Sequence, residues 1–202
     1  MTDEMQSMRD DIAYLKAMAV SGRDGAMSGG WIMIAAGSFY GLASIIQWAS
    51  LTHSAGVTPL MSSLAWLGAL IGFFVVLFLT KRNQGSDSRP RAIGLAWQGV
   101  GWGLFFMFAA IGIATWRTQS AILISFSPAI VLGLYGAAWS VAAAVTAKRW
   151  LMLAAAGSFL GALISAWLVT DTAQWLFYAF ALFMLALVPG VVVLREARAR
   201  GE

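Results

Sequence analysis

The sequence contains no cysteine, a single histidine and few charged residues. The absence of cysteine excludes disulfides, thiolate metal sites and thiol catalysis. Charged residues make up 11% of the 202 positions, whereas a soluble domain carries about 25%. The net charge is only +4, and the basic residues lie in short clusters rather than along one face. A nucleic-acid partner is therefore not expected.

The sequence consists largely of long apolar runs, and 60% of the residues are hydrophobic. A helix needs about 20 apolar residues to cross the hydrocarbon layer of a bilayer. Six segments reach this length, near 30–50, 60–80, 92–116, 121–146, 150–170 and 173–194. We therefore expect an all-α integral membrane protein embedded in a lipid bilayer. Its predicted parts are a cytoplasmic helix and linker (1–28), a six-helix domain (29–196) and a cytoplasmic tail (197–202).

No Asp, Glu, Lys, Arg or His lies within the body of any of the six segments. Ionisable residues at that depth mark proton relays, ion-coupled transport and voltage sensing. The only histidine, His53, lies in the loop 51–59 and cannot by itself ligate haem or complete a metal site. A His53–Ser54 dyad is poorly placed because the two residues are adjacent in a loop. We expect no catalytic residue, metal or cofactor, and interpret His53 as a solvated loop residue or, alternatively, a pH sensor.

One apolar stretch occurs twice in the sequence. Residues 31–48 and 150–167 begin and end with tryptophan and contain Gly-Ser-Phe-x-Gly. The two tryptophans of each copy are 17 residues apart, about 25 Å along a helix. This matches the hydrocarbon layer, at whose edges indole rings gather. The likeness indicates a parallel repeat of helix hairpins; a chance match between two Ala- and Gly-rich segments is the alternative. Trp66, Trp102 and Trp139 fall deeper, and we expect them to pack between helices.

The distribution of basic residues predicts the orientation. Twelve of the 13 Lys and Arg fall before the first segment, in alternate loops or in the tail, and only Arg117 falls on the other side. Cytoplasmic loops carry the excess of Lys and Arg. We therefore expect a multi-pass protein of a cell membrane, specifically a bacterial inner membrane, with both termini in the cytoplasm.

The N-terminal residues 3–21 have the pattern of an amphipathic helix outside the membrane. An apolar seam with heptad spacing runs through Met5, Met8, Ile12 and Leu15. The opposite surface carries more acidic than basic residues, whereas a lipid-binding helix is rich in Lys and Arg. We expect this seam to dock on protein: the chain's own bundle, a second copy or a separate partner.

Small residues four positions apart recur in the apolar segments. The pairs are Gly37 and Gly41, Gly68 and Gly72, Gly99 and Gly103, and Gly157 and Gly161. Lipid supplies little hydrophobic force between helices, so close backbone approach must hold them together. These GxxxG pairs predict tight helix contacts, either within one subunit or in a homo-oligomer.

Prolines and polar side chains mark further positions in the helices. Thr58-Pro59 is typical of a helix start, and Asp171 with Gln174 resembles a capping box. Pro128 and Pro189 lie inside predicted helices and should kink them. Four polar side chains inside the segments are candidates for lining a solute path: Tyr40, Gln47, Gln98 and Tyr135.

Two hypotheses of function remain. The first is a non-catalytic membrane module, a regulatory, sensory or accessory subunit whose N-terminal helix docks a partner. The second is a small channel or facilitator for a neutral or weakly charged solute, which requires a continuous wet cavity near Gln47, Gln98, Tyr40 or Tyr135. An enzyme is not expected, because no catalytic constellation is present.

Overall fold

A computed structural model describes Ile12, residues 29–82 and residues 92–199. Of these residues 91% are helical and none lies in a strand. Six helices are long and apolar enough to cross a membrane: Gly29–Leu51, Pro59–Arg82, Ile93–Thr118, Ile122–Thr146, Arg149–Trp167 and Ala173–Ala199. Within the described residues, the expectation of helical structure with six long apolar helices is confirmed.

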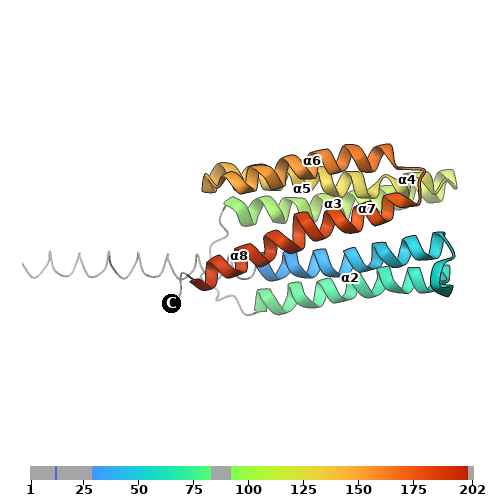
Figure 1. Ribbon diagram of the computed structural model, residues 1–202, viewed down its shortest axis with the longest axis horizontal. Coiled ribbons are helices and arrows are strands. Elements are labelled where there is room, and N and C mark those ends of the chain that lie inside the picture. Colours follow the sequence, from blue (N-terminus) through green and yellow to red (C-terminus); the bar gives the residue numbers. More distant parts are fainter. Residues whose placement is uncertain (1–11, 13–28, 83–91, 200–202) are drawn as a thin grey trace, which may run out of the picture.

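Figure 1 labels most of these elements. They are α2 (Pro59–Arg82), α3 (Ala92–Thr118), α4 (Ile122–Ser125), α5 (Ser127–Thr146), α6 (Arg149–Trp167), α7 (Ala173–Leu182) and α8 (Val188–Ala199). The helix Gly29–Leu51, blue and unlabelled, is called the first helix. The C-terminal helix comprises α7, a π-helical segment η2 (Phe183–Leu187) and α8. A short 3₁₀ turn, η1 (Ser54–Gly56), joins the first helix to α2.

The helices run side by side with their turns at the two ends of the bundle (Figure 1). α5 makes its most extensive contact with α6, α3 packs against α5, and α6 also contacts α7 and η2. α2 lies beside the first helix, because the Phe39 ring lies close to Gly72 and Ser62 bonds to Gln47. The C-terminal helix contacts both groups and joins them into one bundle.

The buried core lies where α5, α6 and the C-terminal helix meet. Trp139, Leu132 and Leu182 are its largest fully buried side chains. The ring centroid of Trp139 is 5.0 Å from that of Trp97 and 6.3 Å from that of Trp150. The expectation that Trp139 packs between helices is therefore confirmed. The same expectation is wrong for Trp102, which is 57% exposed on α3, because only one side of α3 packs against α5.

The two Gly-Ser-Phe-x-Gly copies lie on the first helix and on α6, and both face the C-terminal helix. A Cβ atom added to Gly37 would lie 2.7 Å from the backbone nitrogen of Leu187. A Cβ at Gly157 would lie 3.2 Å from the side chain of Leu185. The two copies therefore contact the same short segment, η2, through their glycines.

The phenylalanine of each copy contacts a glycine on a different helix. A Cβ at Gly72 of α2 would lie 3.1 Å from the Phe39 ring, and a Cβ at Gly136 of α5 would lie 2.7 Å from the Phe159 ring. In both copies, glycines of the motif contact the C-terminal helix. The phenylalanine ring contacts the helix that is adjacent in the sequence, α2 for the first helix and α5 for α6. The shared arrangement is consistent with the repeat, whose origin stays a prediction.

Both internal prolines coincide with breaks in regular α-helix. Phe126 interrupts the fourth helix between α4 and α5, and Pro128 lies in the first turn of α5. In the C-terminal helix, the π-helical η2 ends at Leu187, and Pro189 is the second residue of α8. A proline lacks the N–H that would bond to the carbonyl four residues earlier, so the Leu185 carbonyl has no such backbone donor. The indole N–H of Trp139 donates to that oxygen at 3.0 Å.

Gln174 corrects the interpretation of the sixth helix start. The predicted capping box with Asp171 is wrong: the Asp171 carboxylate accepts the Ala173 N–H at 2.8 Å, while the Gln174 amide points inward. Gln174 is 1% exposed and donates to the carbonyls of Ser125 and Ser165 at 2.8 and 2.9 Å. These oxygens lie at the break before α5 and in the last turn of α6. At such helix ends, carbonyl groups have no N–H partner within their own helix. The buried amide therefore ties three helices together.

Candidate functional site

A polar hollow lies at the turn between the first helix and α2. Its volume is about 290 Å³, and we call it the hairpin hollow; its lining residues are Gln47, Ser50, Leu51, His53, Pro59, Ser62 and Ser63. α2 begins as predicted, because the Met61 N–H donates to the Thr58 hydroxyl at 3.3 Å ahead of Pro59. That start places Ser62 and Ser63 opposite the end of the first helix.

The orientation of the Gln47 amide follows from its neighbours. Its oxygen accepts the Ser62 hydroxyl at 2.6 Å and the Trp66 indole N–H at 3.2 Å. An indole N–H can only donate, so the atom facing it must be the amide oxygen. The Gln47 NH₂ group is therefore the free end of the amide, and no other described residue accepts a hydrogen bond from it.

Ser50 and His53 complete the polar lining. Ser50 is 7% exposed, and its hydroxyl makes no hydrogen bond to any described residue. His53 is exposed and adopts a left-handed backbone with φ of 56°. Ala55 also has a positive φ, 53°, which is costly for a residue with a Cβ. The tight turn brings the imidazole to the rim of the hollow.

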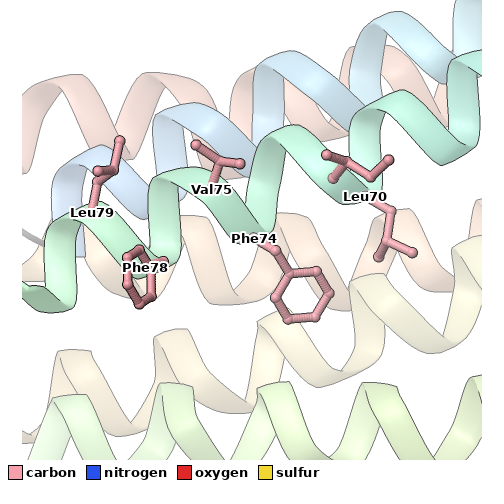
Figure 2. A pocket seen from close by; sticks show the side chains of 6 residues that line it. Leu70, Phe74, Val75, Phe78 and Leu79 are labelled. Atoms are coloured by element: carbon pink, nitrogen blue, oxygen red, sulfur yellow. The ribbon is translucent and has the colours of Figure 1, made fainter.

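A second, apolar hollow of about 390 Å³ lies on α2 alone (Figure 2). We call it the apolar hollow; its lining residues are Leu70, Ile71, Phe74, Val75, Phe78 and Leu79. All six side chains are between 44% and 65% exposed. Nothing in the sequence analysis singled out this surface, because a uniformly apolar helix gives no signal of which side packs.

The four candidate solute-path residues extend from the hairpin hollow through the core to the outer face of α3. Gln47 lines the hairpin hollow, and Tyr40 packs beside it against Trp66, with ring centroids 6.2 Å apart. Tyr135 is buried in the core, its ring centroid 5.3 Å from that of Trp97. Gln98 is exposed on α3. Tyr40 also packs against the core cluster that contains Tyr135. The structure thus places Tyr40 between Gln47 and the core but leaves Gln98 on the outside of the bundle.

The predicted packing glycines differ in their surroundings. Close contacts surround Gly37, Gly41, Gly72, Gly157 and Gly161, where an added Cβ would lie between 2.6 and 3.3 Å from a neighbour. A Cβ at Gly103 would lie 3.8 Å from Leu134, whereas at Gly68 and Gly99 no described atom lies within 4 Å. The use of the GxxxG pairs in helix association stays a prediction.

The predicted docking seam lies mostly outside the described residues. Met5, Met8 and Leu15 fall outside them, and Ile12 is helical and 59% exposed. Among the described residues, no group of three or more His, Cys, Asp or Glu is placed to hold a metal ion.

The sequence did not predict two hydrogen bonds that link helices of the bundle. In these bonds the side chains of Gln174 and Trp139 donate to backbone carbonyls of other helices. Each carbonyl lies at or near a break in a helix, and which side chain reaches it becomes visible only after the helices are arranged. Comparison with protein-family models, with curated proteins and with solved structures found no match.

Proposed function

We propose that this chain is an integral membrane protein of six spans that acts as a non-catalytic module, a regulatory, sensory or accessory subunit. The observation that carries membrane insertion is the exposed surface of α2 and α3. Large apolar side chains are exposed along both helices, from Leu60 to Leu79 and from Leu95 to Trp116. Soluble proteins rarely expose contiguous apolar patches of such extent, and lipid would cover these.

The described basic residues support an orientation with both termini in the cytoplasm. Lys81 and Arg82 end α2, Lys148 and Arg149 form the α5–α6 turn, and Arg195 lies in α8. The Lys148 ammonium pairs with the Glu196 carboxylate, so the α5–α6 turn lies beside α8 at one end of the bundle. The positive-inside rule assigns this end to the cytoplasm.

A cysteine-free chain allows a direct test of this orientation. Ala55 and Ala147 are matched positions: both are exposed, both lie in turns with positive φ, and they lie at opposite ends of the helices. An impermeant thiol reagent applied to intact cells should label Ala55→Cys and should label Ala147→Cys only after permeabilisation. The reverse pattern would invert the topology, and equal labelling of both would reject membrane insertion.

The module role is supported by how the polar side chains are used. The amide of Gln174 and the indole of Trp139 bond to carbonyls freed at helix breaks. Gln47 bonds to Ser62 and Trp66 of the adjacent helix. A facilitator would need a continuous wet cavity near Tyr40, Gln47, Gln98 or Tyr135. Gln47 lines a hollow at the turn between the first helix and α2, Tyr135 is buried in the core, and Gln98 lies on the outer face of α3. This distribution favours the module.

The N-terminal seam is the proposed docking element for a protein partner or a second copy. Replacing Ile12 and Leu15 with Asp should abolish partner co-purification or reduce oligomer size, because it places charge on the apolar seam. Replacing Arg9 and Lys16 on the polar surface with Gln is the matched control. If both double variants behave like the unmodified chain, the docking role is wrong.

A second copy of the chain is also a candidate to pack against the glycines that have no close neighbour in the structure. Gly68 and Gly99 lie on exposed sides of α2 and α3 with no described atom near an added Cβ. Oxidative cross-linking of Gly68→Cys and Gly99→Cys, in a chain without other cysteines, tests each face. A disulfide-linked dimer from one variant identifies that face, and failure of both rejects self-association through these glycines.

A further inference from the structure

We propose that the turn between the first helix and α2 binds a phospholipid, with the phosphate in the hairpin hollow and one acyl chain in the apolar hollow on α2. The inference rests on the proposed membrane insertion, which places this turn at the level of the outer headgroups. It assigns a ligand to two hollows that the helix packing leaves open.

The hairpin hollow presents hydrogen-bond donors that lack partners among the described residues. The Gln47 amide is held by its oxygen, so its two N–H groups face away from Ser62 and Trp66. Ser50 is 7% exposed as a residue, and its hydroxyl makes no hydrogen bond to another described residue. His53 adds a ring N–H at the rim. A phosphate diester offers only acceptor oxygens, which suit such a set of donors.

The two hollows lie in line along one helix. Ser63 lines the hairpin hollow and Leu70 lines the apolar hollow. They are seven residues apart, so they share one face of α2 about 10 Å apart along its axis. Phe74 and Phe78 continue the apolar hollow by two further turns (Figure 2). A headgroup in the polar hollow would therefore direct an acyl chain onto Leu70 and Phe74.

The lining favours a lipid phosphate over a free anion. None of the seven residues of the hairpin hollow is Lys or Arg, so a free anion would be held by neutral donors in competition with water. A phospholipid is held at the level of this turn by the bilayer itself, which presents its phosphate at high local concentration. The acyl chain would keep the phosphate beside the turn, and the donors would select it.

The single histidine of the chain provides a local probe. Full-length protein, purified in detergent through a tag without histidine and labelled with ¹⁵N-histidine, gives one imidazole signal, that of His53. The titrants are dihexanoyl phosphatidylglycerol, dihexanoyl glycerol without a phosphate, and inorganic phosphate. The phospholipid should shift the His53 signal to saturation, while each of the other two should require at least about tenfold higher concentration.

Variants test the donors. Gln47→Glu keeps the acceptor oxygen for Ser62 and Trp66 but replaces the NH₂ group with a second oxygen. Ser50→Ala removes the unpaired hydroxyl. Each should weaken phospholipid binding about tenfold, the effect of one hydrogen bond to a charged group. Ser63→Ala is the control, because its hydroxyl lines the same hollow but already donates to the Pro59 carbonyl at 3.0 Å; it should change binding less than about twofold.

The outcomes separate this proposal from the membrane assignment. An unmoved His53 signal, an equal response to dihexanoyl glycerol or inorganic phosphate, or equal losses in Ser50→Ala and Ser63→Ala would each overturn the phospholipid site. Alkaline carbonate extraction of native membranes tests insertion independently. A chain that stays in the membrane pellet without a His53 response refutes the lipid site alone, whereas a chain released by carbonate refutes both.

Discussion

α2 and the C-terminal helix are the two most apolar of the six long helices, yet their surroundings are opposite. In the most apolar stretch of α2, 6% of the residues are buried, compared with 39% in the C-terminal helix. α2 buries only Ser62 and Ala69, while the C-terminal helix contacts the first helix on one side and α6 on another. Hydropathy therefore does not distinguish the centre of this bundle from its edge.

The difference lies in side-chain size and backbone approach. The first helix and α6 present Gly37, Gly41 and Gly157 to the C-terminal helix. At Gly37 the two backbones approach closely, while Gly41 and Gly157 accommodate the side chains of Phe183 and Leu185. α2 presents exposed Leu, Ile and Phe side chains on its outer face. Because lipid chains are as apolar as leucine, burial of large side chains gives little drive for helices to associate in a bilayer. Small residues and interhelical hydrogen bonds therefore determine which helices lie at the centre of the bundle.

The largest expected contrast is between two tryptophans. Trp139→Ala should lower the free energy of unfolding by about 3–5 kcal/mol, because the side chain is 1% exposed and its loss also removes the indole N–H that donates to the Leu185 carbonyl. Trp102→Ala, on the exposed side of α3, should change it by less than about 1 kcal/mol. Reversible unfolding in mixed micelles measures both. Equal losses would show that α3 is as tightly packed as α5.

A smaller contrast is expected between two glycines. Gly37→Ala should destabilise the protein by about 1–3 kcal/mol, because the new Cβ would lie 2.7 Å from the Leu187 backbone. Gly68→Ala, with open space around it, should be neutral or slightly stabilising, since alanine favours helix. The same unfolding measurement applies. A neutral Gly37→Ala would contradict the close approach of the first helix to the C-terminal helix.

Two glutamines allow the same comparison of buried and exposed positions for polar side chains. Gln174→Leu should cost about 1–2 kcal/mol, because it leaves the Ser125 and Ser165 carbonyls without the amide donor. Gln98→Leu, on the exposed face of α3, should leave stability unchanged or increase it in lipid. If Gln98→Leu is the more destabilising variant, α3 has a polar partner in the assembled protein.

The smallest effect concerns the ion pair between the α5–α6 turn and α8. Lys148→Met should lower stability by less than about 1 kcal/mol, because the Lys148 and Glu196 side chains are about one-third exposed and water screens the pair. The difference from unmodified protein should shrink further at high salt. Arg149→Met, at the exposed neighbouring position, is the control. A loss above 2 kcal/mol that persists at high salt would show that this contact is structurally central.

Much of the local structure was predictable from short-range patterns. Apolar run length predicted the six helices, Thr58-Pro59 predicted the start of α2, and Pro128 predicted a break. Gln174 was misread because a side chain three residues after an acid can either cap its own helix or reach another. Which of the two occurs depends on whether a carbonyl without a backbone donor lies within reach, here that of Ser125.

The candidate site was only partly foreseeable. Gln47 stood out as a polar residue in an apolar segment, and His53 as the only histidine. Their convergence with Ser50 and Ser62 depends on the geometry of a turn with positive φ at His53, Ala55 and Gly56. The apolar hollow had no counterpart in the sequence analysis, because its residues look like any other lipid-length apolar run.

By itself, the sequence determined that the chain forms helices, how many are long and apolar, and where they begin and break. These properties depend on run length, on proline and on capping residues, all of which act within a few positions. Only the tertiary structure decided which helices form the centre, which carbonyls Gln174 and Trp139 satisfy, and which donors remain open in the hairpin hollow. Those outcomes depend on the distances between backbone segments that are far apart in the sequence. Side-chain size sets these distances, and apolarity alone does not determine them.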